Sequence, residues 1–187
     1  MRKTISLIAI ICSEIGITAW RQHDHNIKQV KGLLRGIQSS NRSTSKDEAK
    51  KQKRDQYIVA QHQNYINVCQ GFVLKAKETI QILRELGILS LSQDLRLSIV
   101  EQYIRHAERQ IDQIHRRVDL DEKIPHEEKV FSIFEPHTEW ISKGKAGVPQ
   151  ELGLGVCVLK DQYGFIIYHQ VLEQQTDDKV AVDMAQV

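Results

Sequence analysis

The stretch Glu128–Lys145, EKVFSIFEPHTEWISKGK, divides the chain into two parts of different character. Before it lie long polar segments with apolar residues at helical spacing, and after it come short runs rich in Val, Ile and Tyr. Inside it, the β-branched and aromatic run Lys129–Phe134 predicts a buried strand, which leads into Glu135 and a proline turn. We therefore predict an α+β protein in which helices precede strands.

Two segments of the first part carry apolar residues at alternating steps of three and four, the pattern of a coiled-coil seam. About nine residues, Gly87 to Leu95, join the two segments, so we expect an antiparallel helical hairpin. Ser45 followed by Glu48 has the spacing of a capping box and predicts the start of the first helix. The seam positions are Tyr65, Cys69, Phe72, Ala76, Thr79, Leu83 and Leu86 in the first helix, and Leu97, Val100, Ile104, Ala107, Ile111, Ile114 and Val118 in the second.

The opening of the chain allows two interpretations. Apolar residues from Ile27 to Ile37 continue the run Ile5–Cys12 at helical spacing, which predicts one buried helix from the start to about Gln38. A basic start followed by an apolar run is also the outline of a secretory signal or membrane anchor. However, Glu14 interrupts that run, which falls short of the roughly 20 apolar residues of a membrane span. We therefore prefer the buried helix and keep a membrane-anchored or exported protein as the alternative.

Charge is unevenly distributed along the chain, whose formal net charge is +2. Residues 1–60 contain 12 Lys or Arg and 5 Asp or Glu, whereas the remainder contains 14 and 19. A basic first third suits a polyanionic partner such as nucleic acid, but a solvated surface would carry the same charge.

Common catalytic and metal-binding patterns do not occur. The glycines match neither GxGxxG nor the Walker spacing, and the chain contains neither GxSxG nor HExxH. Three cysteines without CxxC spacing argue against a disulfide framework and a zinc site, and favour a reducing compartment. The spacing of His23, His25, His106 and His115 does not converge on a metal, so we expect surface histidines.

Short strands follow the dividing stretch. Leu154–Lys160 and Phe165–Val171 predict two strands around a turn, Asp161–Gly164. Asp177 or Asp178 then predicts the cap of a short helix near the C-terminus.

The segments EKVFSIFEPHTEWISKGKAGVP and ELGL resemble the DDE transposases of bacterial insertion sequences, specifically the ISNCY-type group. AERQIDQIHRRV before them and VCVLKDQYGFIIYHQVLEQQTDD after them extend the resemblance, which is best from about Ala107 to Val182. It implies that residues 1–122 are a helical insertion, with a coiled-coil-like hairpin at about 46–118. It also implies that residues 123–187 are part of an RNase H-like catalytic core, with a partial sheet of about three strands.

The reaction implied by this resemblance is metal-dependent DNA strand cleavage and transfer, which uses Mg²⁺ or Mn²⁺ held by two Asp and one Glu. No residue here matches those three motifs. The first Asp would precede Met1 and the other two acids would follow Val187, so we expect an internal fragment without catalytic activity or a metal of its own. The implied partner is the DNA of insertion-sequence ends, in the bacterial cytoplasm and not at a membrane, with a homo-oligomer left open.

Four residues near the dividing stretch are candidates for function. Glu135 is the candidate catalytic or auxiliary carboxylate, with a turn residue that accepts a hydrogen bond beside Pro136 as the preferred explanation. His137, Lys143 and Lys145 are candidates for contact with DNA phosphates, with a solvated loop as the alternative. A non-catalytic DNA-binding or oligomerisation module, supported by the basic first third and the helical hairpin, is the alternative function.

Overall fold

The computed structural model describes residues 1–42, 46–135, 137–142, 147, 149–173 and 175–185. The chain divides into two compact units, Met1–Pro125 and His126–Val187. Over the described residues, the first unit consists of helices and the second contains two small antiparallel sheets and one helix. The protein is therefore α+β, with helices preceding strands as predicted.

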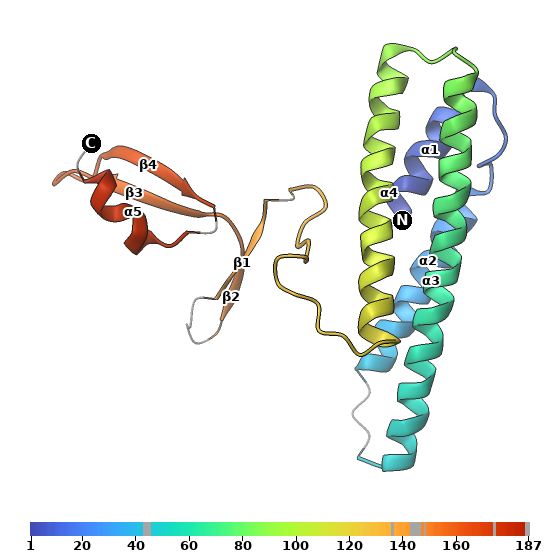
Figure 1. Ribbon diagram of the computed structural model, residues 1–187, viewed down its shortest axis with the longest axis horizontal. Coiled ribbons are helices and arrows are strands. Elements are labelled where there is room, and N and C mark those ends of the chain that lie inside the picture. Colours follow the sequence, from blue (N-terminus) through green and yellow to red (C-terminus); the bar gives the residue numbers. More distant parts are fainter. Residues whose placement is uncertain (43–45, 136, 143–146, 148, 174, 186–187) are drawn as a thin grey trace. The chain divides into compact units, whose positions relative to one another are not determined.

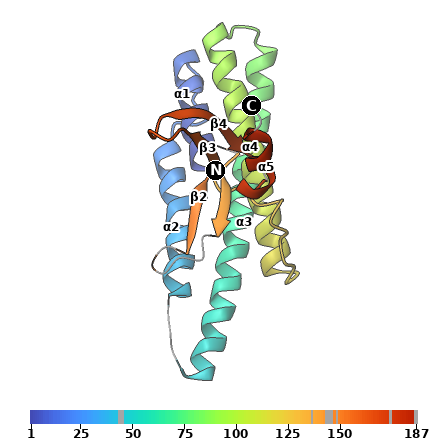
Figure 2. The ribbon, with the colours of Figure 1, turned by 90° about the vertical axis from the view of Figure 1, so that its left-hand side faces the viewer.

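Four helices form the described part of the first unit: α1 (Arg2–Ile15), α2 (His23–Asn41), α3 (Glu48–Glu85) and α4 (Leu91–Val118). α3 and α4 lie side by side as an antiparallel hairpin, visible in Figure 1 as the two longest helices. α1 and α2 cover one side of it, with α1 toward the turn between α3 and α4 and α2 toward the other end (Figures 1 and 2).

The hairpin predicted from the two seams is confirmed. Ala76 and Leu83 on α3 are 0% exposed, as are Leu97 and Val100 on α4, so the seams form the centre of the core. The last position of the first seam, Leu86, follows the helix and is 48% exposed. The core also includes Ile5, Ile8, Ile11 and Cys12 of α1, Val30 and Ile37 of α2, and Tyr65, Cys69, Ile104, Ala107 and Ile111 of the hairpin.

The prediction that Ser45 caps α3 is wrong. Asp47 is the N-cap residue, and its Oδ1 accepts hydrogen bonds from the backbone nitrogens of Ala49 (3.0 Å) and Lys50 (3.4 Å). Ser45 lies outside the described residues. An aspartate is as effective a cap as a serine, and its negative charge interacts favourably with the helix N-terminus.

The prediction of one continuous helix from the start to about Gln38 is also wrong, because α1 ends at Ile15. Gly16 has a φ of 84°, a left-handed conformation that costs a glycine little. The backbone nitrogens of Gly16 and Ile17 donate to the oxygens of Ser13 and Cys12, which closes the helix end. The turn lets the apolar face of α1 and that of α2 contact the hairpin separately. Among the described residues, no helix combines the length and apolar character required to cross a membrane.

Trp20 fixes the connection between α1 and α2 to α3. Its side chain is 1% exposed, and its Nε1 donates to Thr79 Oγ1 at 3.0 Å. Its ring lies against Phe72, with centroids 6.3 Å apart, and under the Lys75 ammonium at 4.6 Å. Lys75 Nζ also donates to the Ala19 oxygen at 2.7 Å. Trp20 therefore anchors the connection to the helical core.

In the second unit, β1 (Glu139–Ser142) pairs with β2 (Gln150–Gly153), and β3 (Gly155–Lys160) pairs with β4 (Ile166–Leu172). β3 and β4 confirm the predicted strand pair, and Asp161 Oδ1 accepts from the nitrogens of Tyr163 and Phe165 in the turn. The last helix, α5, spans Asp177–Met184. Its N-cap residue is Thr176, so Asp177 and Asp178 occupy the first turn and do not cap the helix.

The predicted strand at Lys129–Phe134 is wrong, because this segment is irregular and pairs with no strand among the described residues. Phe131 packs its ring between His126 (5.1 Å between centroids) and Trp140 (5.6 Å). The preference of aromatic residues for strands reflects how well they pack on a sheet. In this segment Phe131 packs against other rings instead. The strand nearest to the prediction, β1, begins at Glu139.

One face of the β3–β4 pair is covered and the other is open. Leu172 of the covered face packs against Val180 and Met184 of α5, together with Cys157 and Leu159. On the opposite face, Val156, Val158 and Val171 are 50%, 40% and 46% exposed. We call these three valines the open face of the β3–β4 hairpin.

Candidate functional site

Glu135 and His137 lie in the turn that precedes β1. Ser132 Oγ accepts from the backbone nitrogens of Phe134 (3.3 Å) and Glu135 (3.1 Å), and the Glu135 backbone oxygen accepts from Thr138 N (3.0 Å). These bonds hold the backbone, while the side chains of Glu135 and His137 are exposed. The turn thus presents one carboxylate and one imidazole to solvent, two residues apart. Lys143 and Lys145, the other two candidates, lie outside the described residues.

The acids of the described residues do not assemble into a metal site. Mg²⁺ and Mn²⁺ require several oxygen ligands in one place. Within the described ranges, no three or more His, Cys, Asp or Glu side chains converge closely enough to hold a metal ion. The described residues therefore form no cluster that fits the divalent cation implied by the transposase resemblance, and Glu135 is not part of a described carboxylate cluster.

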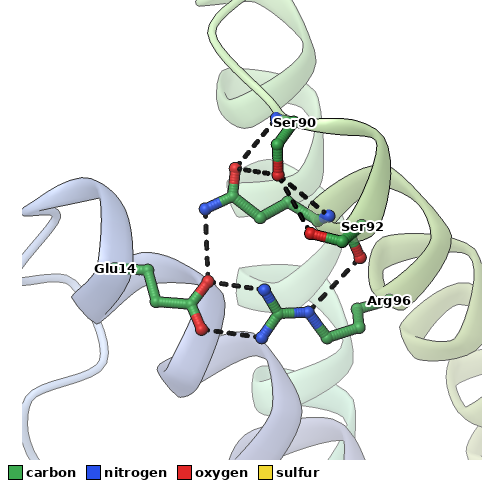
Figure 3. Close-up of polar contacts among 5 residues, drawn as sticks. Glu14, Ser90, Ser92 and Arg96 are labelled. Atoms are coloured by element: carbon green, nitrogen blue, oxygen red, sulfur yellow. Dashed lines mark hydrogen bonds and ion pairs between the residues drawn. The ribbon is translucent and has the colours of Figure 1, made fainter.

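A network of hydrogen bonds and charge connects α1 to the start of α4 (Figure 3). Arg96 donates from both terminal nitrogens to the Glu14 carboxylate, at 2.7 and 2.6 Å, and Gln93 Nε2 donates to Glu14 Oε2 at 3.2 Å. Gln93 also forms the capping box of α4 with Ser90. The hydrogen bond and charge of Arg96 lower the pKa of Glu14.

This network is structural. Three hydrogen bonds engage the Glu14 carboxylate and its pKa is lowered, which makes it a poor proton acceptor for a substrate. Sequence reasoning recognised Glu14 only as an interruption of an apolar run. The missing signal was the partner, Arg96, which is 82 residues away in the sequence.

The thiols of the helical core are protected from chemistry. Cys12 and Cys69 are each 1% exposed, and burial raises the pKa of the Cys12 thiol to about 11. Burial also raises the pKa of Cys69, whose neighbour is the buried Tyr65. Because the thiolate is the reactive form, neither cysteine is suited to act as a nucleophile or a metal ligand near neutral pH.

His106 departs from the expectation of a surface histidine. Its Nε2 is buried and has no hydrogen-bond partner in the described part of the chain. Burial, followed by the charges of Arg109 and Arg105, lowers its pKa, so the ring is neutral at pH 7. We interpret it as a half-buried packing residue of α4.

A groove of about 540 Å³ runs between α3 and α4 on the outside of the hairpin. Ile80 and Ile104 form its floor, 6% and 3% exposed. Lys77 pairs with Glu108 across it and Arg84 pairs with Glu101, at 2.6 Å. Four of the charged side chains that line the groove are therefore already paired with one another.

Basic residues of the first third occur both with and without acidic partners in the part of the chain that the structure describes. At the start of α3, Lys50, Lys51 and Arg54 pair with Asp47, Glu48 and Asp55, at 3.8, 2.9 and 2.8 Å. On α2, Lys28, Lys31 and Arg35 are exposed, and none of them forms an ion pair within the part of the chain that the structure describes. α2 thus offers positive charge to a partner, as do other exposed residues of the first third such as Arg42, Lys46 and Lys53.

No protein-family model, curated protein or solved structure matches this chain. The transposase resemblance therefore stands as a proposal. Two features remain as candidates for function: the turn with Glu135 and His137, and the cations of α2.

Proposed function

We propose that the chain is part of an insertion-sequence transposase of the ISNCY-type group, in which it supplies a helical insertion and the strand-rich part of an RNase H-like core. The observation that carries the proposal is the series of resembling segments from about Ala107 to Val182. The two-stranded β3–β4 sheet is compatible with it, because such a pair is marginally stable alone and gains stability from further strands at its edges. The setting that goes with this proposal is the bacterial cytoplasm, and the partner is DNA.

In this proposal the chain positions DNA and does not cut it by itself. The acids that hold Mg²⁺ or Mn²⁺ come from polypeptide other than these residues. Glu135 and His137, exposed in the turn before β1, are the described candidates for an auxiliary carboxylate and a phosphate contact. Lys143 and Lys145 are candidates for further phosphate contacts.

Two measurements test this function. Sequencing of the DNA on either side of the gene should reveal a strand-coding segment with an Asp upstream, an Asp and a Glu downstream, and terminal repeats; flanking DNA without any of these would refute the transposase origin. Incubation of the purified chain with terminal-repeat DNA and Mg²⁺ or Mn²⁺ should give no cleavage above background. Cleavage would show that the catalytic carboxylates belong to this chain.

A non-catalytic DNA-binding or oligomerisation module is the second candidate. The observation that favours it is the exposed, unpaired positive charge of α2. Binding of DNA by such a module should weaken steeply with salt, because counterions return to the phosphates when the protein leaves. A flat salt response would remove DNA binding from this candidate, and a monomer at all protein concentrations would remove oligomerisation.

A further inference from the structure

Three cations form a line along the exposed side of α2. Lys28, Lys31 and Arg35 follow one another at steps of three and four, which places them on one side of the helix. Val30 and Ile37, 0% and 6% exposed, lie on the opposite side and belong to the core, so the helix cannot turn this line away from solvent. We call Lys28, Lys31 and Arg35 the α2 basic line.

The α2 basic line has no described acidic partner, whereas several cations of α3 and α4 do. Lys77 and Arg84 of α3 and Arg96 and Arg116 of α4 all pair with carboxylates. α2 contains a single acid, Asp24, which lies 3.6 Å from His23. Like charges three and four residues apart on a helix destabilise it by about 0.2–0.5 kcal/mol a pair. The α2 basic line thus carries a small cost of stability that no described ion pair offsets.

We propose that the α2 basic line binds the phosphate backbone of duplex DNA. Lys28 and Arg35 are seven positions apart, which is about 10 Å along a helix that rises 1.5 Å per residue. One strand of duplex DNA presents about three phosphates over the same distance. Each of the three cations therefore has one phosphate within reach of a flexible side chain, and no cation has to be desolvated without a partner.

The surroundings of the line suit a sugar–phosphate surface. Gln29 and Gln38 are exposed beside it, and amide side chains commonly donate to phosphate oxygens. Gly32 lies between the cations, and a Cβ at this position would meet no atom within 4 Å. Packing within the protein does not require a glycine there. The missing side chain leaves the helix surface open to close approach by the sugar–phosphate backbone of DNA.

Other anionic partners fit less well. A helix that lies on an anionic membrane inserts its apolar side between lipids, but Val30 and Ile37 of α2 are already buried in the core. Protein interfaces depend on aromatic and large apolar anchors, and the exposed side of α2 consists of charged residues, amides and glycine. The contacts involve phosphates alone, so the line supplies affinity without base-sequence preference.

This inference rests on the DNA-binding candidate described above and extends it, because it names the three residues in contact with DNA and the part of the DNA that they bind. DNA contact by α2 can be tested independently of the transposase origin. A chain that is no transposase could still bind random-sequence DNA through α2, and a transposase fragment could bind its ends without using α2.

The experiment measures binding of the full chain to a random-sequence DNA duplex as a function of salt. The test variant replaces all three cations, Lys28→Gln, Lys31→Gln and Arg35→Gln. Each lost phosphate contact removes about 0.9 from the slope of log affinity against log salt, so the variant should lose about 2.7. Between 50 and 200 mM salt, this difference amounts to about 40-fold in affinity.

The matched control removes the same charge from cations that already have partners, Lys50→Gln, Lys51→Gln and Arg54→Gln. Its slope should stay within about one contact of the wild-type value. Far-UV circular dichroism of both variants confirms that the helices persist. Equal loss of slope in the two variants, an unchanged slope in the α2 variant, or binding of phosphatidylserine vesicles in the absence of DNA binding would each overturn the proposal.

Discussion

Replacement of Trp20 by alanine should destabilise the helical unit more than a change at any exposed aromatic residue. The indole is 1% exposed, donates to Thr79 and packs against Phe72 and Lys75. Loss of a buried tryptophan typically costs about 3–5 kcal/mol, through lost burial and the cavity left behind. Thr79 Oγ1 keeps its own bond to the Lys75 oxygen, at 2.7 Å, so the orphaned hydroxyl adds little. We expect a total of about 4 kcal/mol.

Urea unfolding followed by far-UV circular dichroism measures this loss, because the helices of the first unit give most of the signal. A loss of 4 kcal/mol corresponds to a fall in Tm of about 15 °C for a unit of this size. Trp20→Phe separates the two contributions, since it keeps most of the apolar volume and removes only the donor to Thr79. We expect it to cost about 1–2 kcal/mol.

The control is the second tryptophan, Trp140, whose side chain is 41% exposed. Trp140→Ala should change the unfolding free energy of the helical unit by less than about 0.5 kcal/mol. A loss below about 1 kcal/mol for Trp20→Ala, or equal losses for the two tryptophans, would refute the conclusion that the connection between α1 and α2 is part of the core.

Three further predictions follow from individual residues. With a thiol reagent at pH 8, native protein should show one fast-reacting cysteine, Cys157, and two slow ones, because Cys12 and Cys69 are buried and the pKa of Cys12 is raised to about 11; a Cys157→Ser variant that keeps its fast phase would contradict this. Arg96 lowers the pKa of Glu14 from its ordinary value of 4.5. The stability lost in Glu14→Gln should therefore be constant above about pH 5 and disappear as the pH falls through the pKa of Glu14 in the folded protein. Unfolding of both proteins across this pH range measures the difference, and a difference that grows in acid would refute the prediction. Gly32→Ala should raise the unfolding free energy by about 0.5–1 kcal/mol, because the new methyl group meets open space and alanine favours the helix, whereas a loss of stability would indicate a contact that the structure does not show.

Regular periodicity made the helical hairpin predictable. Steps of three and four persist over two segments, and only a helix places those residues in one line. The break after α1 was missed because apolar spacing continues on both sides of it. Gly16 alone marks the break, and a single glycine inside a helical pattern is a weak signal until its conformation is known.

The strand-rich unit was harder to predict than the helical hairpin. Lys129–Phe134 has the composition of a strand, but a strand requires a partner, and Phe131 packs between His126 and Trp140 instead. The positions of Glu135 and His137 in a turn followed from the neighbouring proline. Whether acids from other parts of a chain meet Glu135 is a property of tertiary structure, and no local pattern encodes it. The α2 basic line was visible in the sequence only as an excess of charge, since its lack of partners depends on where the carboxylates lie.

The contact between α1 and α4 has a consequence for synthesis on the ribosome. Glu14 and Arg96 are 82 residues apart, and the isoleucines of α1 are buried in the same cluster as residues that follow Arg96. At about 5–20 residues per second, roughly 4–16 s pass between the emergence of α1 and that of its partner helix. During this interval the apolar side of the nascent α1 has no completed core to enter. α1 can thus dock against α4 only late in synthesis, and holdase chaperones can bind α1 during this interval.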